Sequence, residues 1–113
     1  MVEITVSDHN EVIVIAFNGE FYLESVAYAE EIWNEQVSKR PSVVGLDCSN
    51  IRYIDSSAIG VLVKFLNSSV KEKISLIFFD LSEAVVTVFH TAKLDDFFTT
   101  MTRREFESTH LSK

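Results

Sequence analysis

The N-terminal residues have the hydrophobic pattern of two adjacent strands. Residues 2–6 alternate apolar and polar side chains, as a half-exposed strand at a sheet edge does. Residues 11–18 are rich in β-branched side chains and predict a second strand, which Gly19 ends. The turn-forming residues 7–10 separate the two segments. Together these features predict a β-hairpin.

The next segment, residues 20–36, has apolar side chains at helical spacing. Its glutamates lie largely off the apolar stripe, so we expect one face to be buried and the other to meet solvent. Pro41 cannot continue a helix, and Lys39 and Arg40 suit the negative end of one. The predicted stripe consists of Leu23, Val26, Ala27, Trp33 and Val37.

Residues 42–48 form a short apolar run that predicts a third strand. The dipeptide Ser49-Asn50 predicts a turn, because both side chains can bond the local backbone. The tripeptide Asp55-Ser56-Ser57 then precedes an apolar segment, residues 58–66, that is too long for a typical strand. Because Asp and Ser are favoured at helix starts, we expect a helix to begin here, at the edge of a sheet.

The C-terminal part continues the alternation of strands and helices. Residues 73–79 predict a strand, residues 83–90 a short helix, residues 95–102 a last strand and residues 103–108 a final short helix. After the hairpin, this alternation requires crossover connections and a largely parallel sheet. We therefore predict one α/β domain over residues 1–113, with a mixed sheet of about five strands and helices packed on it.

The helix predicted from residue 58 has two apolar faces, although a helix on a sheet needs to bury only one. Either neighbouring helices bury the second face, or part of it contacts a partner protein. One face consists of Ala58, Val61, Leu62 and Phe65, and the other of Ile59, Val63, Leu66 and Val70.

Composition narrows the classes of function. The chain has 17 acidic and 10 basic residues and a formal charge of −7, which disfavours nucleic acids and anionic membrane surfaces as partners. Cys48 is the only cysteine, so no internal disulfide can form, and its apolar surroundings predict a core residue. We find no signal peptide and no apolar run long enough to span a bilayer, which predicts a cytoplasmic protein.

The residues around Asp55-Ser56-Ser57 limit the roles that the two serines can have. A serine can cap a helix by accepting a backbone N–H bond, worth about 1 kcal/mol, and one of the two serines suffices for that. A serine hydrolase needs a glycine two residues before its nucleophile, and neither serine has one. His9, His90 and His110 lie in a predicted turn, at a helix end and in the tail, so no Ser-His triad is expected.

Metal and phosphate sites are equally disfavoured. The pairs Asp8-His9 and Asp95-Asp96 lack further ligands at the spacing of a metal site. The three glycines are far apart, so the sequence has no glycine-rich phosphate loop. We therefore expect no metal, no cofactor and no catalytic residues.

The segment LDCSNIRYIDSSAIGVLVKF strongly resembles the motif of the STAS domains of bacterial anti-sigma factor antagonists. That motif has an aspartate at a strand end, a short turn, a second aspartate, two serines, a glycine-like position, an aliphatic residue and a glycine. The corresponding residues here are Asp47, Ser49-Asn50, Asp55, Ser56, Ser57, Ala58, Ile59 and Gly60. The resemblance implies a STAS-type domain over nearly the whole chain.

Three positions refine the resemblance. Gly19-Glu20 also matches a family segment after the second strand. Ala58 replaces the usual glycine, a mild change on a helix. Tyr22 stands where these antagonists often carry an aspartate near the phosphorylation site, so kinase recognition is expected to depart from the common pattern here.

The resemblance implies a function for the serine that follows Asp55. By resemblance, Ser56 is phosphorylated by a partner that is both an anti-sigma factor and a serine kinase. The unphosphorylated form binds that partner and frees the sigma factor, and a metal-dependent serine phosphatase restores the binding form. The remaining motif residues would help to form the partner-binding surface: Asp55, Ser57, Ala58, Ile59 and Gly60.

The expected function is thus a non-enzymatic phosphorylation switch in a bacterial partner-switching pathway that regulates transcription. The alternative is a STAS subunit of a transport or signalling complex in which phosphorylation is absent. The presence of Asp55 and both serines favours the switch. A small hydrolase is the third possibility, disfavoured by the missing nucleophile elbow.

Overall fold

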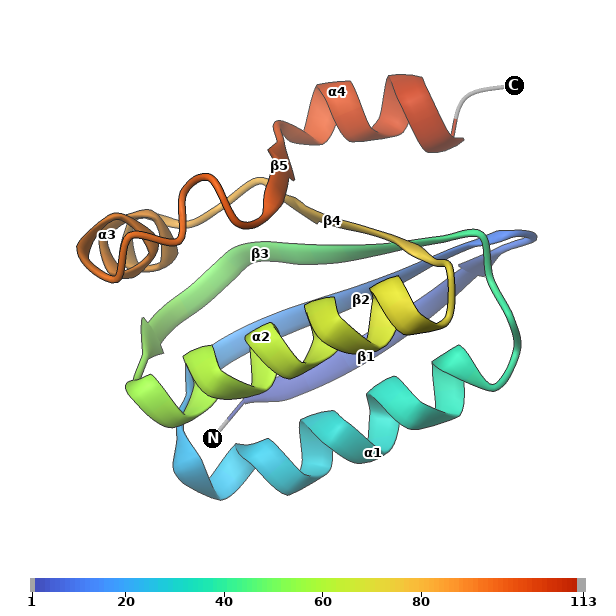
Figure 1. Ribbon diagram of the computed structural model, residues 1–113. Helices are drawn as coiled ribbons and strands as arrows, with labels where there is room; N and C mark the ends of the chain where they lie inside the picture. The colour runs from blue at the N-terminus through green and yellow to red at the C-terminus, as the bar shows by residue number, and fades with distance from the viewer. Residues whose placement is uncertain (1, 112–113) are drawn as a thin grey trace.

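The computed structural model describes residues 2–111 and contains one five-stranded sheet (Figure 1). In chain order the elements are β1 (Glu3–His9), β2 (Val12–Phe21), the 3-10 turn η1 (Leu23–Ser25), α1 (Val26–Val37), β3 (Val43–Ile54), α2 (Ser56–Lys71), β4 (Ser75–Phe79), α3 (Glu83–Thr91), β5 (Thr99–Met101), α4 (Arg103–Phe106) and the π-helical turn η2 (Glu107–Leu111). The strands lie in the order β1-β2-β3-β4-β5. The first pair is antiparallel and the others are parallel, which confirms the predicted α/β fold with a mixed sheet.

Helices α1 and α2 run side by side in the same direction on one face of the sheet (Figure 1). The ring of Trp33 on α1 stacks on Phe65 of α2, with centroids 4.6 Å apart, and the Trp33 Nε1 donates a hydrogen bond of 3.0 Å to the Ser68 Oγ. The second apolar face of α2 is largely used in this packing. Ile59, Val63 and Leu66 are partly buried against the core, whereas Val70 is 71% exposed.

The opposite face of the sheet is covered by α4 and η2 (Figure 1). Phe106 is fully buried there and its ring stacks on Phe79 with centroids 4.3 Å apart. The same ring lies directly over Gly45, where a Cβ would come within 2.4 Å of the Phe106 Cζ. Gly45 is therefore required for the C-terminal helix to reach the sheet.

The structure corrects the expected start of the first helix and the expected limits of the hairpin strands. Residues 20–21 belong to β2, which pairs with β3 as far as Phe21, and Phe21 is fully buried. Gly19 lies inside this strand with φ 117°, rather than ending it. The predicted turn over residues 7–10 is also wrong, because Ser7 to His9 pair with β2 and the chain turns at Asn10, whose φ is 66°.

The predicted turn at Ser49-Asn50 is wrong as well, because β3 continues through it to Ile54. The Asp47 Oδ1 accepts hydrogen bonds from the Ser49 backbone N, at 3.1 Å, and the Ser49 Oγ, at 2.7 Å. The pairing of β2 with β3 slips at this point and again after Gly19, so β3 contains two irregularities. These local hydrogen bonds accompany a bulge within one strand instead of separating two elements.

Candidate functional site

Asp55 holds the N-terminus of α2 and connects it to the start of the first helix. It is the N-cap residue, and its Oδ1 accepts a hydrogen bond of 3.0 Å from the Ala58 N. Its Oδ2 accepts a second hydrogen bond, of 3.2 Å, from the backbone N of Leu23 in η1. The Asp55 N in turn donates to the Phe21 O at 3.3 Å. The side chain of Asp55 therefore joins the start of α2 to the turn η1, and its backbone N–H joins it to the end of β2.

This finding corrects the expectation that Ser56 or Ser57 caps α2. Within residues 2–111, neither serine hydroxyl makes a hydrogen bond to another protein group. Ser56, the first residue of α2, is exposed, whereas Ser57 is half-buried. Ser56 is thus the more accessible of the two serines, and its hydroxyl makes no hydrogen bond that holds the fold within residues 2–111.

The other motif residues divide between the core and the surface. Ala58 is fully buried and Ile59 is half-buried against the core. Gly60 is exposed, and it lies four residues after Ser56 on the same side of α2. The accessible part of the motif is therefore the row formed by Ser56 and Gly60.

Two exposed apolar side chains lie near the start of α2. Leu23, tied to Asp55 through its backbone, is 68% exposed, and Tyr53, three residues before Ser56, is 53% exposed. The ring of Tyr53 meets that of Tyr22 edge-on, with centroids 5.8 Å apart. Neither surface residue is predicted by the sequence pattern, because Leu23 belongs to the predicted buried stripe of the first helix and Tyr53 carries no signal of its own.

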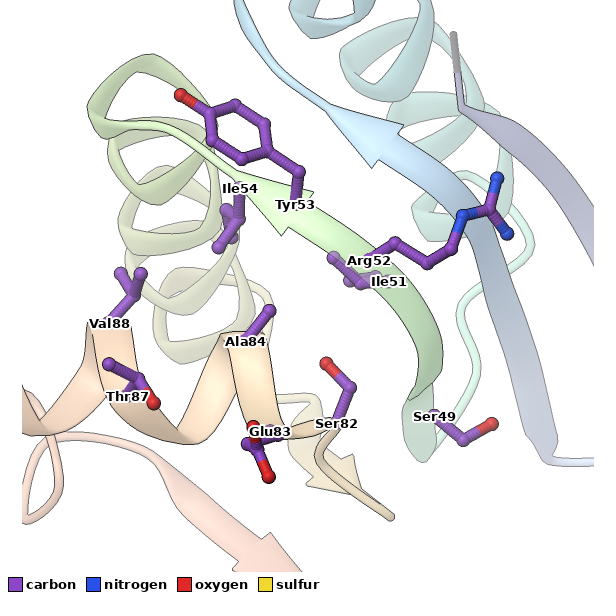
Figure 2. Close-up of a pocket in the computed structure, with 10 residues that line it drawn as sticks. All are labelled: Ser49, Ile51, Arg52, Tyr53, Ile54, Ser82, Glu83, Ala84, Thr87 and Val88. Carbon is purple, nitrogen blue, oxygen red and sulfur yellow. The ribbon is translucent and has the colours of Figure 1, made fainter.

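An open groove of about 560 Å³ lies between α3 and the half of β3 that extends past β4 (Figure 2). The pairing of β3 with β4 ends at Asp47 and Phe79, which leaves this part of β3 without that strand neighbour. The Arg52 side chain points away from α3 in Figure 2. The lining residues are Ser49, Ile51, Arg52, Tyr53, Ile54, Ser82, Glu83, Ala84, Thr87 and Val88.

The chemistry of this groove does not single out a ligand. Glu83 places a carboxylate in the first turn of α3, where the helix N-terminus would otherwise attract an anion. The irregularities in β3 make its edge a poor template for an added strand. We assign no ligand to the groove.

A second polar cluster joins α4 to the middle of β3 and to the residue that follows β4. The Arg103 Nη2 donates to the Asp47 Oδ2 at 2.8 Å, and the Arg103 Nε donates to the Asp80 Oδ2 at 3.1 Å. The guanidinium also lies over the Phe79 ring, 5.2 Å from its centroid. Partial burial pushes the pKa of Asp47 upwards, but hydrogen bonds from Arg103 and Ser49 outweigh it and hold the pKa below its ordinary value. The cluster anchors the C-terminal helix.

The three histidines lie apart from Ser56 in the described part of the chain. His9 bonds to Ser7, His90 bonds to Asp95, and His110 packs on Phe106, so none of these contacts involves Ser56. Across residues 2–111, no three His, Cys, Asp or Glu side chains come together as metal ligands. In the same part of the chain, no helix has the length and apolar character needed to cross a bilayer.

Comparison with known proteins identifies the family to which the sequence is similar. The family model of the STAS domain matches residues 3–109. Among curated proteins, the anti-sigma-F factor antagonist RsfB of Mycobacterium tuberculosis is 33% identical over 61 residues, which cover 54% of this chain and 50% of that protein. The match therefore reaches only half the length of this relative.

Solved structures share the fold over nearly the whole chain. An anti-sigma factor antagonist from Mycobacterium paratuberculosis superimposes with a TM-score of 0.86, covering 99% of this chain and 96% of its own, at 19% identity. The phosphorylated form of SpoIIAA, a Bacillus cell fate determinant, gives a TM-score of 0.73, covering 94% of this chain and 97% of its own, at 16% identity.

Proposed function

This chain belongs to the STAS domain family, and from that premise we propose that it is an anti-sigma factor antagonist controlled by phosphorylation of Ser56. The observation that carries the proposal is the exposed Ser56 hydroxyl at the start of α2, which is free because Asp55 performs the capping. Similarity to RsfB and to phosphorylated SpoIIAA supports the same conclusion.

A phosphate at this position can be accommodated without unfolding the domain. Phosphorylation adds a charge of about −1.5 to −2, and a helix N-terminus is favourable for negative charge. Asp55 uses the Ala58 N–H, and the N–H groups of Ser56 and Ser57 have no acceptor one turn earlier in the helix. A phosphate on Ser56 can therefore meet free donors, while the neighbouring Asp55 carboxylate offsets part of this gain.

The same phosphate would interfere with a partner that packs on this surface. A protein face shaped for a hydroxyl would have to desolvate a hydrated dianion without a compensating charge. In this proposal the unphosphorylated chain binds an anti-sigma factor that is also its serine kinase, and it thereby releases the sigma factor. A metal-dependent phosphatase reverses the modification, and the chain itself acts in the cytoplasm without catalysing a reaction.

Phosphorylation is tested by incubating the chain with candidate anti-sigma factor kinases and ATP. Tandem mass spectrometry should find the phosphate on Ser56, and the Ser56→Ala variant should remain unmodified. Ser57→Ala is the matched control and should be modified like the wild type. Phosphate on Ser57 alone would reject the assignment, and its absence from both serines would favour a STAS subunit that works without phosphorylation.

Binding is tested by calorimetry with the anti-sigma factor that binds the wild-type chain. Ser56→Asp should weaken binding by at least about tenfold, because a carboxylate must be desolvated at the interface. Its free energy of unfolding should stay within about 1 kcal/mol of the wild type. Ser56→Ala should bind normally. Equal affinities of Ser56→Asp and wild type would contradict the switch.

A further inference from the structure

Strand β1 forms one outer edge of the sheet, and within residues 2–111 only β2 pairs with it. Six of its seven residues are exposed, and the pairing with β2 runs through all seven without a bulge. The strand contains neither proline nor lysine, and bulges, prolines and lysines are common devices that protect an edge. By contrast, β5 at the other edge has only three residues. The outer edge of β1 is therefore open to a further strand.

The hairpin loop determines which backbone groups of β1 point away from β2. The loop has two residues, and His9 pairs with Val12 across it. A loop of this length is closed by a hydrogen-bonded pair, so every second residue back from His9 bonds to β2. The N–H and C=O groups of the alternate residues Ile4, Val6 and Asp8 therefore point outward and are available to another strand.

We propose that the outer edge of β1 pairs with β1 of a second copy of this chain, antiparallel and centred on Val6. A two-fold axis at Val6 pairs all seven residues of both strands, and such a contact closes at two copies. The outward backbone groups then meet as hydrogen-bonded pairs, Val6 with Val6 and Ile4 with Asp8. An axis at Asp8 would instead set two carboxylates opposite each other.

The side chains of β1 are complementary to one another in this register. On the face away from α1 and α2, Glu3 lies across from His9 of the second copy, and Thr5 lies across from Ser7. A carboxylate opposite an imidazole donor and a pair of hydroxyls are both favourable cross-strand pairs. On the other face the two Val6 side chains, each 37% exposed in the single copy, meet at the axis. No like charges oppose each other within the paired residues.

The dimer contact uses a surface that is separate from the proposed switch. Ser56 begins α2 directly after β3, and β2 lies between β3 and β1 in the sheet. The contact therefore does not include Ser56 and does not depend on its phosphorylation. Each copy carries a formal charge of −7, which opposes association, so the dimer should strengthen as added salt screens this repulsion.

Cross-linking tests the register directly. Thr5 and Ser7 of opposite copies would form a non-hydrogen-bonded pair with Cα atoms about 4.5 Å apart, a distance that a disulfide can bridge. Under mild oxidation, an equal mixture of Thr5→Cys and Ser7→Cys should give a disulfide-linked dimer, whereas either variant alone should not. Cys48 does not interfere, because it is fully buried and burial raises the pKa of its thiol. A cross-link formed by Thr5→Cys alone would show another register and reject the proposal.

The variant Val6→Pro tests the outward hydrogen bonds. Proline removes an N–H that points away from β2, so the fold of the single copy should persist. In sedimentation at increasing concentration, the wild type should show a monomer–dimer equilibrium and Val6→Pro should stay monomeric. Val6→Lys sets two like charges opposite each other at the axis and should weaken association at least about tenfold. Circular dichroism should show native folding for both variants.

A matched pair of charge changes tests the contact between Glu3 and His9. Glu3→Lys and Glu72→Lys reduce the negative charge of the chain equally, so the general repulsion between copies falls by the same amount. Glu3→Lys should nevertheless weaken association, because lysine removes the acceptor opposite His9. Glu72→Lys, at the exposed C-cap of α2, should not weaken it.

A wild-type chain that stays monomeric up to millimolar concentration would overturn the proposed dimer. A dimer that persists in both Val6→Pro and Val6→Lys would overturn it too, because the contact would then lie elsewhere. The proposed function is tested separately. If the wild type dimerises through β1 while Ser56→Asp binds the anti-sigma factor as tightly as the wild type, the dimer stands and only the switch is rejected.

Discussion

Replacing Asp55 by alanine tests whether this one carboxylate holds the start of α2 in place. The change removes the acceptor for the Ala58 N at 3.0 Å and the acceptor for the Leu23 N at 3.2 Å. It leaves both serines intact, so it also tests whether a neighbouring hydroxyl can replace the cap. If a serine could do so at no cost, the variant would be almost as stable as the wild type.

The structure allows the two losses to be estimated separately. Removing an N-cap acceptor costs about 1 kcal/mol. The hydrogen bond to Leu23 links segments 32 residues apart and has a charged acceptor in a partly exposed site, so about 1 kcal/mol is appropriate for it too. Asp55→Ala should therefore lower the free energy of unfolding by about 2 kcal/mol, and the melting temperature by about 8 °C.

Urea unfolding followed by tryptophan fluorescence measures this loss directly, because Trp33 is the only tryptophan and is buried against Phe65. Asp55→Ser is the matched control. Serine retains a cap acceptor but has one side-chain oxygen where aspartate has two, so it should lose about 1 kcal/mol. The idea that both Asp55 hydrogen bonds stabilise the fold would be refuted by either of two results. One is a loss in free energy of unfolding below about 0.5 kcal/mol for Asp55→Ala, and the other is an equal loss for Asp55→Ala and Asp55→Ser.

Two further predictions concern the C-terminal helix. Because the folded-state pKa of Asp47 is depressed, its contribution to stability is present above its ordinary pKa of 3.8 and is lost as the pH falls through the folded-state value. Arg103→Gln should therefore lower the free energy of unfolding by about 1 kcal/mol at pH 7, after allowance for partial exposure. In urea titrations below pH 4, the difference in free energy of unfolding between the wild type and this variant should become smaller. Gly45→Ala should destabilise by about 1–3 kcal/mol through its clash with Phe106, and Phe106→Leu in the same chain should recover part of the loss in thermal unfolding.

The order of elements could be predicted because each helix and strand has its own hydrophobic period. The predicted buried stripe of the first helix is wrong at Leu23 and Ala27, which are both exposed, because the predicted helix begins directly after Gly19. The structure instead extends β2 to Phe21 and inserts the 3-10 turn η1 before α1. A 3-10 turn has three residues per turn and shifts the phase of the side chains, so Leu23 points to solvent.

The continuity of β3 could not be predicted from local residues. Ser49 and Asn50 have turn propensity, and the Asp47 side chain does bond the Ser49 backbone. Pairing with β2 nevertheless extends over both sides of this point, and it absorbs the extra residues as irregularities in the ladder. Long-range pairing thus overrides a local preference, as it often does in sheets.

The residue that caps α2 could not be predicted by local rules alone. Asp55, Ser56 and Ser57 are all good N-cap residues, and propensity does not choose among them. A contact far along the chain distinguishes them, because the Leu23 N–H donates to the second carboxylate oxygen of Asp55 and a serine has no second side-chain oxygen to accept it. This contact spans 32 residues and is invisible in the local pattern.

That choice has a functional consequence for the proposed switch. A phosphate on a capping serine would change the hydroxyl that holds the helix, and modification would then be coupled to local unfolding. With Asp55 as the cap, the Ser56 hydroxyl can gain or lose a phosphate while both Asp55 contacts persist. The modification then alters charge and shape only at the surface, which is what a partner packed over Ser56 would detect.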